Sequence, residues 1–491
     1  MEKYKSIKEY ISGRSCSVAG FGVSNIPLVS ILVSLGERVD VWDKKAFYEL
    51  GSDAEALAEK GVIFNSSLGG KEVFDGICGD VIFRSPGIRP DIPPFLEATR
   101  RGSILSSEME LFFTLTPSKL FAISGSDGKT TSTTLCGLFL ECDSKRKGCG
   151  RVYVGGNIGK PLLEFCDEMT ENDSSVLELS SFQLMTMDRC RSAKRVAITN
   201  ISPNHLDWHH GMGEYIDAKN NIVGKETELF VTNRESPDAM GVALELCGSQ
   251  GLRIALFSSV RHSYGEIFDG LPINNGLAVY VRDRRICISD GETENVILDT
   301  SRIRVPGVHN IENFMTAIAL TYGLVDNEVY SLVADEFLGV EHRLQLIRTI
   351  HGVDFINSSI DSSPTRTSAA LSALAGRDIV AICGGYDKKI PFEPLARALF
   401  GCARAVVLTG ATSDKILEAV NKYGKEHNCI DKLRVESAAD FTQAVYKAKS
   451  IADRLVGRGP CVLLSPACAS FDAFKNFAER GNTFKRIVNR L

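Results

Sequence analysis

The sequence predicts an α/β protein of three domains, each built on a sheet of mainly parallel strands. The length of 491 residues is more than one ordinary hydrophobic core holds. A short apolar strand that ends in a tight glycine turn recurs near residues 17–22, 120–128 and 379–385. Strands that alternate with helical patterns are typical of parallel sheets. We expect the domains to cover residues 1–107, 108–338 and 339–491.

The composition is typical of a globular protein in solution. The chain has 56 basic and 61 acidic residues, a formal net charge of −5, which argues against a protein that coats nucleic acid. The N-terminus has no apolar core of a signal peptide, and the apolar run 26–35 is too short to cross a bilayer. Fourteen cysteines without a CxxC pair indicate reduced thiols. We expect a cytoplasmic monomer that inserts into no membrane.

The first domain starts with a strand that runs into the turn Gly20-Phe-Gly22-Val-Ser24 and then into a helix. The next strand ends at Asp43, about as far past the glycines as the ribose-binding acid of a dinucleotide fold. Asn25 replaces the third glycine of that fingerprint, and nothing downstream offers hydride chemistry. We therefore expect a Rossmann-like domain with a site for a nucleotide diphosphate rather than a site for NAD. The alternative is an α/β domain whose glycines only form turns. The candidate residues follow strands: Gly22, Val23, Ser24, Asp43, Lys44, Lys45 and Ser85.

The central domain contains a candidate phosphate loop. An apolar strand at 120–123 ends in Gly125-Ser126-Asp127-Gly128-Lys129-Thr130-Thr131, and a helical pattern follows at 132–140. This layout places backbone N–H groups and a helix N-terminus around phosphate oxygens. Lys129 supplies a cation, and Thr130 or Thr131 can bind Mg²⁺. Ile123 stands where the standard motif has its first glycine, so the loop is a compressed variant; an ordinary turn is the alternative.

Two further candidates follow neighbouring strands. Glu178 ends an apolar strand, where a carboxylate is costly to bury unless a cation compensates it. Mg²⁺ is the expected cation beside a phosphate loop. His205 follows another strand, and the ends of parallel strands meet in one crevice. A structural glutamate and an ordinary loop histidine are the alternatives, and Lys219 on a predicted helix alone indicates only a surface lysine.

Five motifs occur in the order found in Mur ligases: Gly125-Ser-Asp-Gly-Lys-Thr-Thr131, Gly156-Asn-Ile-Gly159, Leu177-Glu-Leu-Ser-Ser-Phe-Gln-Leu184, Asn204-His-Leu-Asp207 and Ala218-Lys219. The chain resembles this family, and most closely its D-glutamate-adding members. The resemblance covers nearly the whole chain and is weakest at 142–151 and 232–300. It implies an ATP-dependent ligase that joins D-glutamate to UDP-N-acetylmuramoyl-L-alanine through an acyl phosphate, in the synthesis of peptidoglycan precursors.

The resemblance also implies roles for residues of the central domain. Lys129 binds the ATP phosphates, and Thr130 and Glu178 bind Mg²⁺. Asn157 lies near the uridine nucleotide. His205 contacts this substrate and binds a second Mg²⁺, together with Lys219 as a carbamylated lysine.

For the rest of the chain, the resemblance places Asn310 and Asn313 at the adenine nucleotide and Arg343 on the transferred phosphoryl group. The two asparagines could instead cap a helix. Asp361 contacts ATP, and D-glutamate is held by Thr365, Lys388, Ser470 and Phe477. The final domain is Rossmann-like. Three positions depart from the common family pattern: Asp127 replaces Asn, Ser363 replaces Lys and Arg366 replaces Asn.

Two other functions fit part of these observations. A folylpolyglutamate-type ligase shares the central layout but lacks a nucleotide domain like residues 16–87. A non-catalytic nucleotide-binding regulatory protein would not need Lys129, Glu178, His205, Lys219 and Arg343 together. The charged segment 142–151 is expected to form an exposed hairpin or loop whose basic cluster faces solvent.

Overall fold

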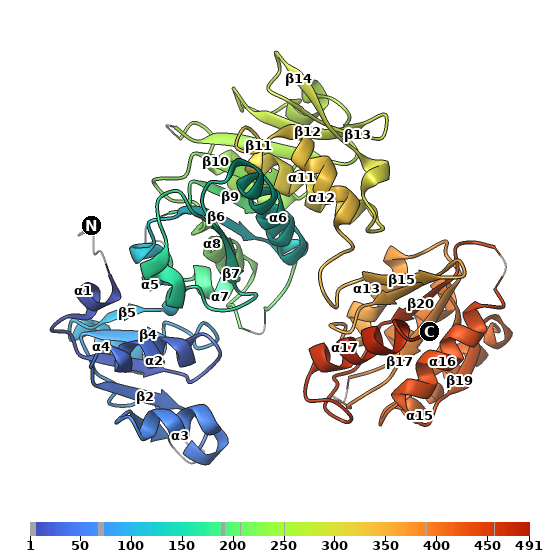
Figure 1. Ribbon diagram of the computed structural model, residues 1–491, viewed down its shortest axis with the longest axis horizontal. Coiled ribbons are helices and arrows are strands. Elements are labelled where there is room, and N and C mark those ends of the chain that lie inside the picture. Colours follow the sequence, from blue (N-terminus) through green and yellow to red (C-terminus); the bar gives the residue numbers. More distant parts are fainter. Residues whose placement is uncertain are drawn as a thin grey trace. The chain divides into compact units, whose positions relative to one another are not determined.

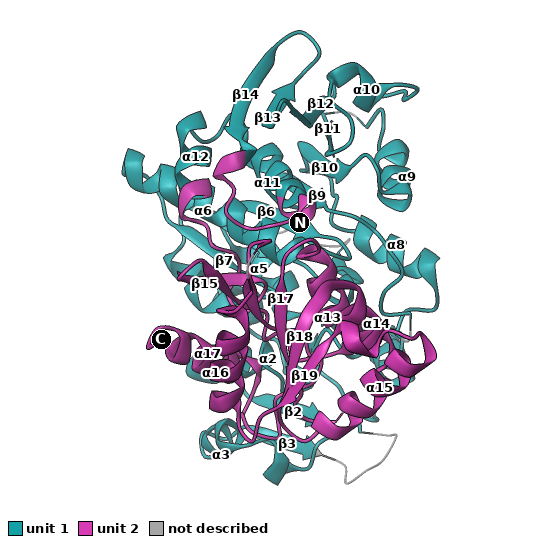
Figure 2. Ribbon diagram, turned by 90° about the vertical axis from the view of Figure 1, so that its right-hand side faces the viewer, with its two compact units in different colours: residues 1–300, 311–333 teal, residues 301–310, 334–491 magenta. Residues whose placement is uncertain are grey.

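The computed structural model describes residues 6–66, 73–187, 192–206, 208–249, 251–387, 390–455 and 457–491. Contacts divide the chain into two compact units, residues 1–300 with 311–333 and residues 301–310 with 334–491 (Figure 2). Three separate sheets, mainly parallel, run through the chain in sequence order (Figure 1). The α/β prediction is confirmed, whereas the domain boundaries at 107 and 338 stay predictions.

The first sheet has the order β3-β2-β1-β4-β5, and all its strands are parallel. Strands β1 and β4 lie side by side in the middle and are buried along their whole length, as expected for parallel strands covered on both faces. Their carboxyl ends form the switch point where ligands bind in open α/β sheets. The strands are β1 Cys16–Ala19, β2 Val39–Asp43, β3 Ile63–Ser66, β4 Val81–Arg84 and β5 Ile104–Ser106; the helices are α1 Ile7–Ile11, α2 Asn25–Ser34, α3 Ser52–Ala58, α4 Pro93–Arg100 and α5 Glu108–Leu115.

The second sheet has nine strands in the order β14-β13-β12-β11-β10-β9-β6-β8-β7. Strands β6 to β12 are parallel, and the hairpin strands β13 and β14 extend one edge in antiparallel fashion. β6 lies between β8 and β9 and is parallel to both. The phosphate loop, Glu178 and the loop of His205 therefore all lie at the carboxyl ends of three adjacent strands. The strands are β6 Lys119–Ser124, β7 Val152–Gly156, β8 Ser174–Glu178, β9 Arg195–Ile198, β10 Leu229–Asn233, β11 Arg253–Ser258, β12 Leu277–Arg282, β13 Arg285–Ser289 and β14 Glu294–Asp299. The helices are α6 Lys129–Lys147, α7 Ser181–Leu184, α8 Met212–Asn220, α9 Pro237–Glu245, α10 Tyr264–Phe268, α11 Val308–Thr321 and α12 Asn327–Glu336.

Helix α6 is longer than the sequence predicted. It begins at Lys129, directly after the phosphate-loop turn, and ends at Lys147. The expected loop at 142–151 is therefore wrong as far as Lys147. Two lysines near the end of the helix each follow an acid by four residues, a spacing that stabilises helices: Lys145 pairs with Glu141 and Lys147 with Asp143. The basic residues do face solvent.

The third sheet has the order β15-β16-β20-β17-β18-β19, with β15 antiparallel and the others parallel. Here β16, β20 and β17 lie side by side in the middle. The strands are β15 Gln345–Ile350, β16 Val353–Asn357, β17 Ile379–Cys383, β18 Ala403–Leu408, β19 Arg434–Ser437 and β20 Cys461–Leu464; the helices are α13 Pro364–Ala373, α14 Glu393–Cys402, α15 Ser413–Glu426, α16 Phe441–Ala452 and α17 Phe477–Val488.

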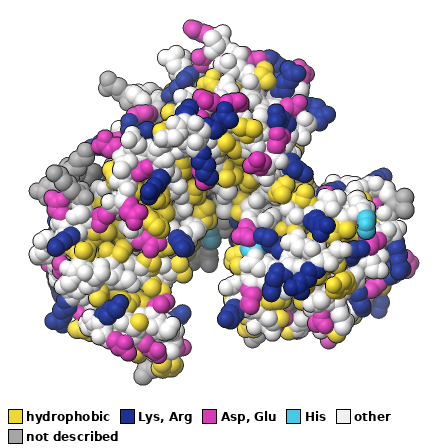
Figure 3. Space-filling view, in the orientation of Figure 1, with side chains coloured by type: hydrophobic (Ala, Val, Ile, Leu, Met, Phe, Trp, Pro, Cys, Tyr) yellow, Lys and Arg dark blue, Asp and Glu magenta, His cyan; other side chains and the backbone are white. Residues whose placement is uncertain are grey.

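The surface and the thiols agree with the composition. On the face drawn in Figure 3, basic and acidic side chains are interspersed. Every cysteine that the structure describes is a free thiol. Among the described residues, no helix combines the length and the apolar character needed to cross a membrane.

Candidate active site

The phosphate loop after β6 requires glycine at two positions. Gly125 has φ 143° and Gly128 has φ 80°, both in the left-handed half of the backbone map. A Cβ on Gly125 would lie 1.9 Å from the Thr199 hydroxyl, and one on Gly128 would lie 2.4 Å from Asn313 Oδ1. Gly128 is also the N-cap of α6, so the turn delivers the chain directly into the helix N-terminus. The loop therefore has the shape that exposes backbone N–H groups to an anion.

The loop is held in place by the chain segment that follows β9. Thr199 Oγ1 donates to Asp127 O over 2.5 Å, and Asn200 Oδ1 accepts from Asp127 N over 3.0 Å. Ser126 Oγ lies 3.0 Å from the Tyr215 hydroxyl. The carboxylate of Asp127 belongs to an exposed residue, so this departure from the family pattern does not bury a charge.

Two lysines converge on one carbonyl oxygen of this loop. Lys129 Nζ and Lys219 Nζ each donate to Gly125 O over 2.8 Å. Lys219 also donates to Ser124 Oγ over 3.3 Å and lies 4.6 Å from the centre of the Tyr215 ring. Only 1% of Lys219 is exposed, which excludes the surface lysine that its helical position alone indicated. Burial, followed by the charge of Lys129, holds the pKa of Lys219 well below its usual value.

Glu178 ends β8 with one oxygen satisfied and one not. Its Oε1 accepts from Asn157 Nδ2 over 2.8 Å, whereas Oε2 is buried and has no hydrogen-bond partner among the described residues. Gly156 permits this approach, because a Cβ there would lie 2.2 Å from Glu178 O. A buried carboxylate oxygen without a partner is costly, and it is the donor that a divalent cation prefers.

His205 lies on an exposed loop with an unusual backbone. Its φ of 54° is left-handed, which is rare for a residue with a side chain and is retained when the surroundings fix it. The carbonyl oxygen of His205 accepts from Trp208 N and His209 N, and its ring lies 4.9 Å from the Phe182 ring. Asp207 of the same motif lies outside the described residues.

At the switch point of the first sheet, Asn25 stands at the third glycine position of the dinucleotide fingerprint and has a structural role there. Its Nδ2 donates to Gly20 O over 2.8 Å and to Ser85 Oγ over 3.1 Å, so the side chain joins the glycine turn to the loop after β4. Asp43 accepts from the backbone N–H groups of Phe21 and Lys45. The structure thus brings together the turn with Gly22, Val23 and Ser24, the end of β2 with Asp43, Lys44 and Lys45, and Ser85.

The predicted residues of the second unit lie mainly at the carboxyl ends of β16 and β20. Asp361 is buried, accepts from Ser465 Oγ over 2.8 Å, and has its pKa raised mainly by burial. Arg343 lowers that pKa slightly through its charge. Thr365 is exposed in the first turn of α13. Lys388 lies outside the described residues.

Arg480 was not predicted, although it connects the predicted amino-acid-binding loops. This residue of α17 is 2% exposed and donates to Ser359 Oγ and O, to Cys468 O and to Ala469 O over 2.9–3.1 Å. Ser359 Oγ in turn donates to Phe477 O over 2.7 Å. The buried Ser470 follows directly after Ala469. Burial lowers the pKa of Arg480 to about 10.

The two asparagines of α11 have different surroundings. Asn310 Nδ2 donates to Pro306 O over 2.6 Å, a local bond at the helix start. Asn313 Oδ1 accepts from Ser132 Oγ over 3.3 Å and lies against Gly128. Asn313 therefore contacts the phosphate loop, and the nucleotide role of both residues stays a prediction.

Comparisons with known proteins agree with this geometry. Residues 123–321 match the Mur ligase middle domain, and residues 342–468 match the Mur ligase, glutamate ligase domain. The UDP-N-acetylmuramoylalanine--D-glutamate ligase of Clostridium beijerinckii is 42% identical over 99% of both chains. The ligase of the same name from Ruminiclostridium cellulolyticum is 40% identical over 100% of this chain and 99% of its own.

A solved structure supports the fold across all three sheets. The MurF ligase from Thermotoga maritima in complex with ADP has a TM-score of 0.52 at 14% identity, over 93% of this chain and 96% of its own. The two domain matches together with the full-length identity establish the relationship. The chain belongs to the Mur ligase family, and within it to the group of UDP-N-acetylmuramoylalanine--D-glutamate ligases.

Proposed function

We propose that the protein is an ATP-dependent ligase that forms the amide bond between UDP-N-acetylmuramoyl-L-alanine and D-glutamate, a step in peptidoglycan precursor synthesis. The observation that carries the proposal is the convergence of Lys129 and Lys219 on the compressed phosphate loop, with Glu178 at the end of the neighbouring strand, in a chain 40–42% identical to enzymes of that name over its full length. The alternatives of a folylpolyglutamate-type ligase and of a non-catalytic regulator have no such support. We further propose that the enzyme is a cytoplasmic monomer.

The residues fit two Mg²⁺ ions. Glu178 offers a buried oxygen without a hydrogen-bond partner among the described residues, and Thr130 lies in the first turn of α6 beside the phosphate loop. We assign these two residues to one ion, and His205 with Lys219 to the other. When bound, the ions neutralise negative charge on the triphosphate and on the attacking carboxylate.

The surroundings of Lys219 favour a carbamate. A lysine with a strongly lowered pKa keeps a neutral amine, whose lone pair can attack carbon dioxide. The step forms an N–C bond, releases one proton and leaves a carboxylate on Lys219. This places an anion where the neutral amine was, and the positive charge of Lys129 stabilises it.

The chain's own residues then serve two chemical steps. In the first, the carboxylate of the alanyl group attacks the γ-phosphorus and ADP leaves; Lys129 stabilises charge on the phosphates, and Arg343 that on the transferred group. In the second, the amine of D-glutamate attacks the acyl phosphate and phosphate leaves. Thr365, Lys388, Ser470 and Phe477 orient D-glutamate, and this orientation lowers the entropic barrier.

Phosphate release with each substrate omitted in turn tests the proposal. We expect turnover only when ATP, UDP-N-acetylmuramoyl-L-alanine and D-glutamate are all present. Equal turnover with L-glutamate, or without the uridine nucleotide, would refute it.

A further inference from the structure

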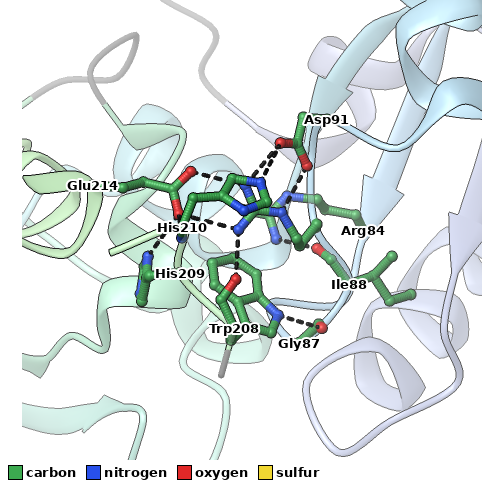
Figure 4. A network of polar contacts seen from close by, with 9 residues as sticks. Arg84, Gly87, Ile88, Asp91, Trp208, His209, His210 and Glu214 are labelled. Carbon is green, nitrogen blue, oxygen red and sulfur yellow. Dashed lines mark hydrogen bonds and ion pairs between the residues drawn. The ribbon is translucent and has the colours of Figure 1, made fainter. Parts of the chain in front are cut away.

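Three side chains join the loop after β4 of the first sheet to the central sheet. Arg84 is fully buried and donates to Pro86 O and Ile88 O of its own loop, and to Phe182 O over 3.1 Å. Trp208 Nε1 donates to Gly87 O over 3.0 Å. Arg89 makes the third connection, to Trp208 O and to the carboxylate of Glu214. Figure 4 shows Gly87, Trp208 and Glu214 of this network. The loop that carries Ser85 is therefore fixed to the segments that carry the cation-site residues.

Arg89 uses all five of its N–H groups. Nε donates to Asp91 over 2.8 Å, and the two terminal nitrogens donate to Asp91, to both oxygens of Glu214 and to Trp208 O, over 2.6–3.1 Å. The guanidinium also lies over the Trp208 ring, 4.9 Å from its centre. The bonds from Arg89 hold the pKa of Glu214 at about 2. This set of bonds requires the planar guanidinium group with its five N–H donors, and the single ammonium group of a lysine cannot form it.

From Glu214, the contacts reach the helix that carries Lys219 and the segment that follows Glu178. Glu214 lies in the first turn of α8, the helix of Lys219, and its Oε2 accepts from His210 N over 2.8 Å. His209 Nδ1 lies 3.3 Å from the same carboxylate, an electrostatic contact without hydrogen-bond alignment. His209 Nε2 lies 2.9 Å from Ser181 Oγ, in the segment just after Glu178.

Aromatic packing connects the network to His205. The Phe182 ring lies 4.6 Å from Trp208 and 4.9 Å from His205. The backbone of His205 is held in its left-handed conformation between these contacts and the bonds to its carbonyl. A displaced Trp208 would therefore move His205 as well.

We infer that Arg89 is a positioning residue that couples the loop binding the uridine nucleotide to the divalent-cation sites that include Glu178, His205 and Lys219. The inference rests on the proposed function for the identity of the two ligands. Because coupling between two sites is reciprocal, the nucleotide strengthens cation binding and the cation strengthens nucleotide binding by the same factor. Arg89 acts on both sites through the loop after β4, Trp208 and Glu214.

Titration of the full-length protein with Mn²⁺, followed by the EPR signal of the free ion, tests the coupling with and without UDP-N-acetylmuramoyl-L-alanine. We expect Arg89→Lys to bind Mn²⁺ about 10–100-fold more weakly, the usual cost of losing a group that orients metal ligands. The strengthening by the nucleotide should disappear. Arg101→Lys, which alters an exposed pair with Glu97 in the same part of the chain, should behave as the wild type.

Wild-type Mn²⁺ affinity and unchanged coupling in Arg89→Lys would overturn the inference. If the variant lost only thermal stability, Arg89 would have a purely structural role, and the inference would be wrong as well. If Arg89→Lys does not fold, Glu214→Gln removes the same ion pair while it keeps the side-chain shape, and is judged by the same titration. Wild-type protein that shows the coupling but forms no amide would contradict the proposed function and leave the inference standing.

Discussion

The two units each bury a basic side chain at the carboxyl ends of their strands, and the two side chains differ in one respect. Lys219 is bound by Gly125 O and Ser124 Oγ, and Arg480 by the carbonyl and hydroxyl oxygens of Ser359, Cys468 and Ala469. Neither has a hydrogen-bonded carboxylate partner among the described residues. Lysine can release its proton at an accessible pH, whereas arginine cannot.

Because of this difference, the two buried basic side chains serve different purposes. The low pKa of Lys219 leaves a nucleophilic amine that can be modified. Arg480 remains charged at neutral pH, because its pKa is lowered only to about 10. It therefore serves as a permanent connector between loops, and adds positive potential where a dicarboxylic amino acid is proposed to bind.

Removal of the amine tests the first half of the comparison and has the largest expected effect. We expect Lys219→Ala to lower turnover by about 10³-fold, the scale of losing charge stabilisation at a reaction centre. High bicarbonate should not restore activity, since no amine remains to be carbamylated. The exposed Lys225→Ala is the matched control. Near-normal turnover of Lys219→Ala would refute the carbamate.

Substitution of Arg480 tests the second half. Arg480→Ala removes the guanidinium donor from oxygens of Ser359, Cys468 and Ala469, of which Ala469 O still accepts from Tyr386 N. We expect the free energy of unfolding to fall by about 3–4 kcal/mol. Arg480→Lys keeps the charge but not the fork, so it should recover part of the stability and raise the KM for D-glutamate more than it lowers kcat. Urea unfolding and initial rates measure both effects, with the exposed Arg486→Ala of the same helix as control. Wild-type stability of Arg480→Ala would contradict a connector role.

Glu108 extends the comparison to a buried acid. It is 4% exposed, its Oε1 has no hydrogen-bond partner among the described residues, and burial raises its pKa from 4.5 to about 7. The folded state thus binds the extra proton between pH 4.5 and 7, and this group's contribution to stability falls as the pH rises through that window.

We therefore expect Glu108→Gln to be more stable than the wild type at pH 8, by about 2–3 kcal/mol, with the difference shrinking towards pH 4.5. Thermal unfolding across this range measures it. The exposed Glu164→Gln should show no such pH dependence. A constant difference at all pH values would mean that packing, not protonation, separates the two proteins.

Asp127 supplies the smallest expected effect, because its charge is exposed and water screens it. We expect Asp127→Asn to lower the KM for ATP by less than about threefold, through relief of repulsion with the phosphates. Initial rates at varied ATP concentration measure this. A tenfold change would show that this carboxylate faces the nucleotide at close range.

The sequence was informative where a residue's chemistry is local. The strands that end at Ser124 and Glu178 and the turn with Gly128 follow from apolar runs and glycine spacing. The sequence did not predict the partners of Arg84, Arg89 and Arg480. Each of them donates to backbone carbonyl oxygens, which every residue has and which no sequence motif marks. For Tyr215 a signal existed: it precedes Lys219 by one helical turn, so the two share a face of α8.

The antiparallel extension of the central sheet has a practical consequence. The turn at residues 290–293 between β13 and β14 is exposed, and these strands form one edge of the sheet. Strands β6 and β8, which carry the phosphate loop and Glu178, lie towards the opposite edge. Loop tips of this kind tolerate added groups. A fluorescent label or an affinity tag at this turn would report on, or immobilise, the working enzyme without touching its chemistry.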